Sequence, residues 1–208
     1  MVGVSDWIAG EAKKSILKDA AVIQRIYNWI DLETFRPRDT MDLQKQLGIL
    51  ENEKVLLGVA SAWGEQKGLQ EMLMAAKSIP DSKVIMVGQM PENVEIPENM
   101  LCVGLVRDPV MLSEYYSMAD LFLNPSVQET FGKTTAEAMS CGTPAVVYKT
   151  TACPELIAEG CGGVVPAYDK EVYVNSVGIM LKKIHDDTSE KCRKSAVSQF
   201  SKHVVLPQ

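Results

Sequence analysis

The 208-residue sequence predicts a doubly wound α/β domain built on a parallel sheet. From residue 54 onward, runs of Val, Ile and Leu alternate with segments of helical period. The runs are almost continuously apolar, as expected of strands that helices cover on both faces of a sheet. We therefore interpret residues 54–208 as one Rossmann-like domain.

The expected strands and helices alternate along this domain. Six apolar runs are the expected strands, at residues 54–60, 83–88, 100–104, 120–126, 143–149 and 162–166. The expected helices lie at residues 67–79, 109–119, 132–140, 153–159, 169–185 and 189–202. Because parallel strands end at one edge of a sheet, the loops that follow them should meet there and form any ligand site.

The first 53 residues follow a different pattern. Residues 1–30 contain two apolar runs on either side of a helical segment that begins near Asp6, which predicts one β-α-β unit. Residues 31–53 are charged, contain Pro37 and end in a polar helix expected at 41–47, so we interpret them as a linker. Residues 1–30 are interpreted as the last β-α-β of a preceding domain, with an edge unit docked on the main sheet as the alternative.

Composition excludes several classes of protein. Apolar residues make up 46% of the chain and charged residues 23%, which is ordinary for a globular protein. The formal net charge of −6 argues against a nucleic-acid partner or binding to an anionic membrane. No apolar run reaches the roughly 18 residues that a spanning helix needs, and no signal-peptide pattern opens the chain. We expect a cytoplasmic protein.

Cysteine and histidine offer little catalytic or metal-binding chemistry. The five cysteines form no C-x-x-C pair, so we expect reduced thiols and neither a disulfide framework nor a zinc site. His185 and His203 lie near the C-terminal end, and no Ser-His-Asp constellation is present. Cys153 has no histidine near it in sequence and is interpreted as a small loop residue, not a nucleophile. We expect no metal and no cofactor.

The helix expected at 132–140 is the main candidate for a binding site. Gly132 would let a ligand approach the backbone closely, and the amides of Lys133, Thr134 and Thr135 would bind an anion at the helix N-terminus. The surrounding segment reads NPSVQETFGKTTAEAMSCGTP, from Asn124 to Pro144.

Two acids, Glu129 and Glu137, stand eight positions apart in this segment. Taken separately, each is an ordinary loop or helix acid. A carboxylate beside a diphosphate is repelled unless it accepts hydrogen bonds from hydroxyl groups. We therefore expect the two acids to face one ligand from two sides, and a nucleotide sugar, with an anionic middle and hydroxyl-rich ends, fits that requirement.

A second candidate turn follows the first strand of the domain. Lys67 and Gly68 lie in the loop between this strand and the helix that follows it. A lysine at the mouth of such a loop could neutralise a phosphate. The alternative is a surface lysine in a first helical turn, where a cation opposes the helix dipole. Neither the P-loop spacing nor G-x-G-x-x-G occurs in this turn.

These motifs together resemble a known family. The order IYNWID, AWGEQKG, MVGQ, VGLV, then the segment from Ser117 to Val147, CPELI and GGVVP resembles the C-terminal, donor-binding half of the retaining GT-B glycosyltransferases of the group 1 class. The E-x7-E element from Glu129 to Glu137 is the strongest part of the likeness, which covers almost the whole chain.

The resemblance implies roles for particular residues. It implies that Lys67 contacts the donor diphosphate and Glu129 the donor-sugar hydroxyls, and that these two residues are catalytic. It assigns Glu137 to the nucleotide ribose. The remaining donor-binding residues that it implies are Phe131, Gly132, Lys133 and Thr134 around the sugar and phosphate, and Val106 and Arg107 near the base. Transfer would proceed with retention and without a metal, the lysine and the helix terminus stabilising the leaving diphosphate.

The resemblance also implies partners beyond this chain. The family's acceptor site, for a glycan or a lipid-linked acceptor, lies on an N-terminal domain of which residues 1–30 would be the end. Contact with the inner membrane would be made through that domain, and the chain stops before the family's final helix. We expect the 208 residues alone to bind donor weakly and not to turn over.

The sequence departs from the family pattern in two places. Ser61 and Ala62 occupy positions where an arginine often precedes the lysine, so phosphate neutralisation should depend more on Lys67, with Lys133 or Arg107 helping. Just before the linker, Trp29 replaces a glycine.

Other functions are compatible with the same pattern. One is a non-hydrolysing nucleotide-sugar epimerase, which would need other acids and histidines in the cleft. Another is a non-catalytic nucleotide-binding or docking module. A phosphate-accepting receiver domain is disfavoured, because Asp120 begins its strand and lies at the wrong edge of the sheet.

Overall fold

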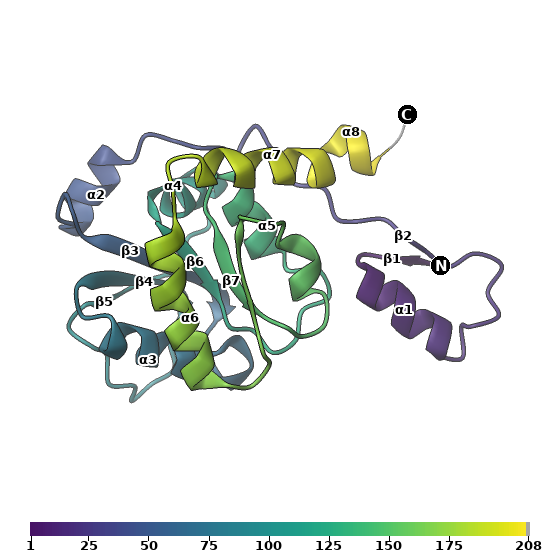
Figure 1. The fold of residues 1–208 in the computed structure, drawn as a ribbon, viewed down its shortest axis with the longest axis horizontal. Helices are drawn as coiled ribbons and strands as arrows, with labels where there is room; N and C mark the ends of the chain where they lie inside the picture. Colours follow the sequence, from purple (N-terminus) through teal and green to yellow (C-terminus); the bar gives the residue numbers. More distant parts are fainter. Residues whose placement is uncertain (207–208) are drawn as a thin grey trace.

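The computed structural model describes residues 1–206 and has a six-stranded main sheet. Its strands are β3 (Lys54–Ala62), β4 (Ser82–Gln89), β5 (Met100–Gly104), β6 (Leu121–Asn124), β7 (Ala145–Tyr148) and β8 (Gly162–Val165). All neighbours are parallel, in the spatial order β5-β4-β3-β6-β7-β8 (Figure 1). The predicted doubly wound α/β fold is confirmed.

The strand order reverses direction between β3 and β6. From β3 the chain adds β4 and β5 on one side, and it then crosses back to place β6, β7 and β8 on the other. The pairs Leu56–Leu121 and Leu57–Phe122 align β3 with β6 at this point. In open α/β sheets, ligands bind in the crevice beyond the carboxyl ends of the two strands at such a reversal.

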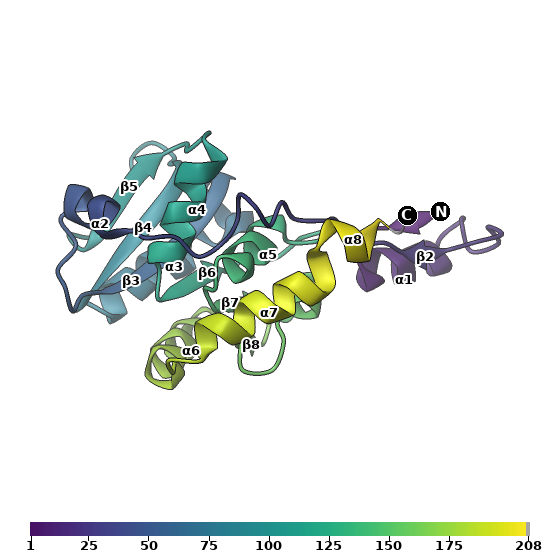
Figure 2. The ribbon, with the colours of Figure 1, turned by 90° about the horizontal axis from the view of Figure 1, so that it is seen from above.

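Helices cover both faces of the sheet (Figure 2). Helices α3 (Leu69–Ser78) and α6 (Lys170–Lys183) pack on one face. Helices α4 (Pro109–Met118), α5 (Lys133–Ser140) and α7 (Thr188–Phe200) pack on the other. The strands alternate between the two cores as their period of two requires, since Val55 and Leu57 join the second core while Leu56 joins the first.

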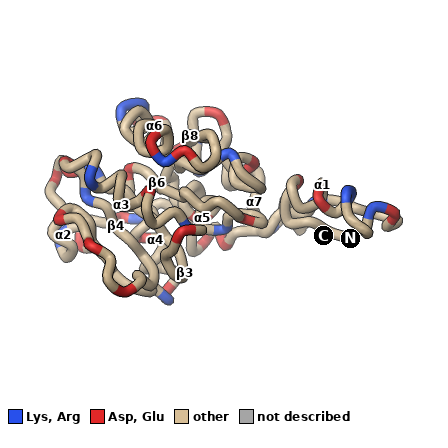
Figure 3. Tube along the Cα trace, turned by 90° about the horizontal axis from the view of Figure 1, so that it is seen from below, with Lys and Arg blue, Asp and Glu red and all other residues tan. Residues whose placement is uncertain are grey.

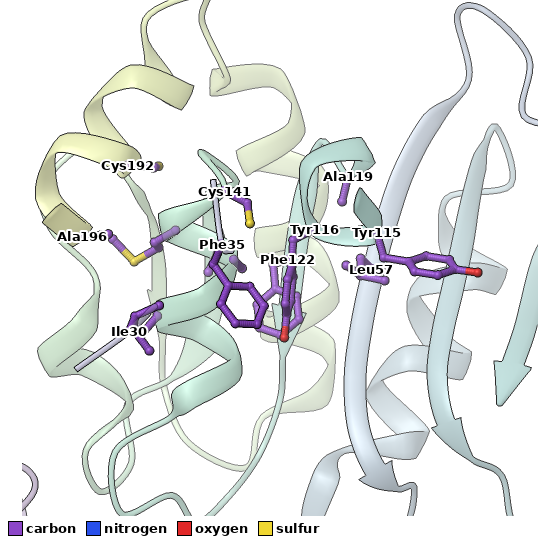
Figure 4. Close-up of a cluster of buried hydrophobic side chains, with 14 of the residues drawn as sticks. Ile30, Phe35, Leu57, Tyr115, Tyr116, Ala119, Phe122, Cys141, Cys192 and Ala196 are labelled. Atoms are coloured by element: carbon purple, nitrogen blue, oxygen red, sulfur yellow. The ribbon is translucent and has the colours of Figure 1, made fainter. Parts of the chain in front are cut away.

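The linker contributes to the core beneath α4, α5 and α7. Phe35 is buried and its ring lies 6.1 Å from that of Tyr116, which in turn lies 5.5 Å from Phe122 (Figure 4). Ile30 is buried too, and its amide donates to the carbonyl of Phe200. Helix α2 (Met41–Leu47) follows where the polar helix was expected. The segment interpreted as a linker from its charges is therefore docked on the domain by its few apolar residues.

One half-buried arginine holds this linker against the domain. Arg193 of α7 donates to the carbonyls of Phe35 at 2.6 Å, Ser140 at 2.8 Å and Leu32 at 3.0 Å. The carbonyl of Ser140 is at the C-terminal end of α5, where a cation also complements the helix dipole. Burial lowers the pKa of Arg193, although the side chain keeps three charge-assisted hydrogen bonds.

The first residues form a separate small unit. Strands β1 (Val2–Gly3) and β2 (Gln24–Arg25) pair in parallel around helix α1 (Asp6–Lys14) and do not join the main sheet. The unit stands beside the main body, with α7 and α8 (Lys202–Val205) leading toward it (Figures 1 and 2). Its strands are shorter than the apolar runs predicted, because few partners are present to pair with them. That the unit ends a preceding domain stays a prediction.

Charged residues of both signs are interspersed along the chain (Figure 3). Among residues 1–206, none of the helices combines the length and the apolar character needed to cross a membrane.

Candidate functional site

Two loops meet at the reversal point of the sheet. The first contains the short helix η1 (Glu65–Lys67), and the second follows β6. Gln66 joins them, since its carbonyl accepts from the amide of Val127 at 3.1 Å. Gly68 permits this approach: its φ is +73°, and a Cβ there would lie 2.5 Å from the ring of Pro125. Because Gly68 has no side chain and adopts the left-handed conformation, the loops after β3 and β6 can lie against each other.

The approach places Lys67 against Glu129. The Lys67 Nζ lies 2.6 Å from Glu129 Oε1, with side-chain exposures of 37% and 19%. The amide of Glu129 donates to the hydroxyl of Thr151 at 3.0 Å, so the loop before α5 is fixed by the turn after β7 as well. The structure thus joins two residues 62 positions apart that the sequence analysis had selected separately.

A pocket of about 210 Å³ surrounds this ion pair. It lies beyond the carboxyl ends of β3 and β6, and its lining residues are Val59, Ala60, Ser61, Trp63, Lys67, Asn124, Glu129, Lys133 and Thr134. The indole of buried Trp63 forms one wall and donates to the carbonyl of Val87 at 3.0 Å. The pocket combines two lysines, one carboxylate and small polar groups.

The N-terminus of α5 opens at the same pocket. Gly132 caps the helix with φ +90°, and a Cβ there would lie 2.9 Å from Leu156 Cδ1. The amide of Thr135 already donates to the carbonyl of Gly132 at 3.0 Å, which corrects the expectation that it binds an anion. Within the described residues, the amides of Lys133 and Thr134 have no such partner. Two free N–H groups and the helix dipole remain for an anion.

Glu137 lies elsewhere, which corrects the expectation that both acids face one ligand. Its side chain is buried, with the residue 5% exposed, and it does not line the pocket. Its Oε2 accepts from the hydroxyl of Tyr116 at 3.1 Å, and its Oε1 lies 3.6 Å from Lys133 Nζ. The hydroxyl of buried Tyr116 holds the carboxylate of Glu137 between α5 and α4, one turn beyond the N-terminus of α5.

Burial makes Glu137 a source of pH dependence. Desolvation raises the pKa of this carboxyl, and the Lys133 ammonium and the Tyr116 hydroxyl offset only part of the effect. A carboxyl with a raised pKa binds more protons in the folded than in the unfolded protein. The stability that this carboxyl contributes is therefore fully present below its pKa in the unfolded protein. It is lost as the pH rises through its pKa in the folded protein.

We expect Glu137→Gln to raise the free energy of unfolding at pH 7 by about 1 kcal/mol, because it removes a charge that is buried in the folded protein. Urea unfolding across pH 4–8 measures this, and the variant should lose less stability than the wild type as pH rises. Glu159→Gln, at an exposed acid, is the matched control. Parallel curves for Glu137→Gln and the wild type would contradict the assignment.

The remaining predicted residues do not line the pocket with their side chains. Phe131 is buried against Tyr27 and Phe200, with ring centroids at 5.7 and 5.6 Å, so it can contribute only its backbone. Val106 and Arg107 follow β5; Val106 packs on the core and Arg107 is exposed. The structure does not bring these two residues to Lys67 and Glu129.

Trp29, the departure just before the linker, lies on the other side of Lys133. It lines a second hollow of about 400 Å³ together with Asn28, Asp31, Phe35 and Lys133. Lys133 therefore borders both hollows, and the crevice continues from the ion pair toward the linker.

The cysteine and histidine side chains of residues 1–206 lie away from any arrangement suited to nucleophilic or metal chemistry. Cys153 is buried, and desolvation raises the pKa of its thiol to about 11, so the thiolate nucleophile is disfavoured at neutral pH. Among residues 1–206 no cluster of three or more His, Cys, Asp or Glu side chains is placed to hold a metal ion. Neither histidine lines the pocket of the ion pair.

Three residues of the site were missed by the sequence analysis: Trp63, Tyr116 and Thr151. Trp63 sits in the AWGEQKG motif and could have been selected as the aromatic nearest Lys67. Tyr116 and Thr151 gave no comparable signal, because their contacts to Glu137 and Glu129 join segments 21 and 22 residues apart.

Two lysines and a helix N-terminus at the reversal point of a doubly wound sheet define an α/β protein suited to an anionic ligand. The chain belongs to the family described as Glycosyl transferases group 1, whose sequence model matches residues 53–183. Together with the fold, this identifies it as the C-terminal domain of a group 1 glycosyltransferase.

Individual relatives agree with this membership. The chain is 31% identical over 208 residues to N-acetyl-alpha-D-glucosaminyl L-malate synthase of Bacillus anthracis, covering 93% of this chain and 54% of that protein. It is similar in structure to sucrose-phosphate synthase of Thermosynechococcus elongatus, with a TM-score of 0.84 and 22% identity over 98% of this chain and 55% of that one. Anabaena HepE, solved with UDP and glucose, gives a TM-score of 0.78 and 20% identity over 96% and 59%. The chain spans about half the length of these relatives.

Proposed function

We propose that this chain binds the nucleotide diphosphate sugar donor of a retaining glycosyltransferase. The observation that carries the proposal is the Lys67–Glu129 ion pair, which lies beside the free amides of α5 in one pocket. A diphosphate over these amides would lie near both Lys67 and Lys133. Glu129 would then accept hydrogen bonds from donor-sugar hydroxyls. The UDP and glucose in the HepE structure support a donor of this class.

The proposed chemistry follows from these charges. In transfer with retention, the bond between the anomeric carbon and the diphosphate oxygen breaks, and an acceptor hydroxyl oxygen bonds to the same face of that carbon. The electron pair leaves on the diphosphate, whose departing oxygen takes up the proton of the acceptor hydroxyl. Because bond breaking precedes that proton transfer, negative charge on the diphosphate grows in the transition state. Lys67, Lys133 and the α5 amides would stabilise that charge, the kind of stabilisation that often contributes most to catalysis. Transfer of this kind needs no metal ion.

Glu137 receives a different role from the one that the family resemblance implies. With 5% exposure it cannot reach a ribose as it stands, but it lies 3.6 Å from Lys133 Nζ. We propose that it orients Lys133 between the two hollows. The acceptor, a glycan or a lipid-linked sugar, would bind to a preceding domain of the whole protein, as would any membrane surface.

The test is calorimetric titration of the 208-residue chain with UDP, GDP, ADP and their sugars, each in the presence of Mg²⁺ and of EDTA. We expect weak binding of one nucleotide series that is the same under both conditions. Added acceptor sugars should yield no transfer. Absence of binding by every nucleotide on a folded sample would favour a docking module, and binding only with Mg²⁺ would contradict metal independence.

A further inference from the structure

A carboxylate of the main domain holds the N-terminus of α1. Glu155, in the short helix η2 (Cys153–Leu156), accepts from the amide of Trp7 at Oε1 and from that of Asp6 at Oε2, both at 2.8 Å. The hydroxyl of Tyr27 donates to the same Oε2 at 3.3 Å. These contacts join segments 128 to 149 residues apart. A carboxylate on two N–H groups of a helix N-terminus is a favourable, charge-assisted arrangement.

Neighbouring residues shape the α1 side of this contact. The Arg25 guanidinium lies 3.9 Å from the centroid of the Tyr27 ring, and its Nε lies 3.2 Å from Asp6 Oδ1. Arg25 thus offsets the charge of Asp6 where α1 receives a second carboxylate. The Tyr27 ring also packs on Phe131 and Phe200, which links the unit to the residue before Gly132.

The segment that carries Glu155 also holds the candidate site. Thr151 accepts from the amide of Glu129 at 3.0 Å, and the amide of Ala152 donates to the Glu129 carbonyl at 3.4 Å. Leu156 is next to Glu155 and packs on Gly132, since a Cβ added to Gly132 would lie 2.9 Å from Leu156 Cδ1. Residues 151–156 therefore contact the sugar-facing acid and the helix tip on one side and α1 on the other.

We propose that Glu155 is a positioning residue that docks the N-terminal unit onto the segment holding Glu129. Residues 151–156 then couple the two, so that a ligand at Glu129 tightens the hold on α1. This coupling rests on the proposed function, whereas the docking itself does not.

The first test is amide hydrogen exchange, resolved by NMR at Asp6 and Trp7, in the wild type, in Glu155→Gln and in the control Glu159→Gln. Glu159 is an exposed acid four positions away, so its variant makes the same change of charge. Glutamine keeps one acceptor oxygen and turns an amide group toward the other N–H. We expect exchange at Asp6 or Trp7 to accelerate about tenfold or more in Glu155→Gln alone. The urea midpoint of the main domain should stay within experimental error.

Equal exchange in all three proteins would overturn the docking role. A lowered urea midpoint with exchange accelerated equally throughout the chain would show a merely structural residue and would also overturn it. The second test adds UDP: exchange at Asp6 and Trp7 should slow in the wild type and not in Glu155→Gln. If UDP binds without this difference, the coupling is wrong. If no nucleotide binds, the proposed function falls, while the first test still decides the docking.

Discussion

Replacement of Lys67 by alanine is expected to weaken, by about 10- to 100-fold, the binding of whichever nucleoside diphosphate the titration of the wild type identifies. The variant would lose the charge-assisted hydrogen bond proposed between Lys67 and the diphosphate, a contact of about 1.5–3 kcal/mol. It also leaves Glu129, whose side chain is 19% exposed, unpaired beside the ligand's negative charge. Calorimetric titration of the variant measures the effect.

The chain supplies a matched control for this change. Lys54 forms an ion pair of 2.7 Å with Asp120 at the opposite edge of the sheet, and it is also a lysine beside a strand. Lys54→Ala should leave the affinity for that nucleotide unchanged. Glu129→Gln should restore part of the affinity when combined with Lys67→Ala, since it removes the unpaired charge. Affinity of Lys67→Ala within twofold of the wild type would rule out the diphosphate contact.

Replacement of Gly68 by alanine is expected to lower the free energy of unfolding by about 3 kcal/mol. Its φ of +73° costs an alanine about 1 kcal/mol or more. The new Cβ would meet Pro125 atoms at 2.5 Å, and overpacking adds about 1–3 kcal/mol. The loops should separate, so the variant should also lose nucleotide affinity. Urea unfolding measures the first effect and titration the second.

Two other glycines allow the conformational cost of Gly68→Ala to be measured separately from its steric cost. Gly48 has φ +67° and no atom within 4 Å of an added Cβ, so Gly48→Ala should show the conformational cost alone. Gly64 is extended and has open space, so Gly64→Ala should be nearly neutral. If Gly68→Ala is no more destabilised than Gly48→Ala, the close approach to Pro125 contributes nothing to stability.

The main sheet was predictable because its strands are buried on both faces. The run at 100–104 became β5 with the predicted bounds. The run at 120–126 became the shorter β6, Leu121–Asn124, which ends before Pro125 because proline has no N–H to continue the ladder. The helix expected at 67–79 begins at Leu69, because Gly68 is left-handed. Single glycine and proline residues decide where these strands and helices begin and end, and the hydrophobic period alone does not locate them.

The site was predictable where chemistry depends on local sequence. Lys67, Glu129 and the α5 terminus follow from strand ends that must meet. The direction of Glu137 does not, because it depends on which face of α5 is turned to Tyr116. Glu155 gave no signal at all, since its partners Asp6 and Trp7 are 149 and 148 residues away in the sequence.

The anchoring of the linker confines where this molecule could bend. Ile30 is fixed by Phe200, and Arg193 holds the carbonyls of Leu32 and Phe35, so the chain from Ile30 onward moves with the sheet. Before it, Ile26 is bonded to Gly3 within the N-terminal unit. A swing of that unit would therefore have to be absorbed by the torsion angles of residues 27–29, a pivot three residues long.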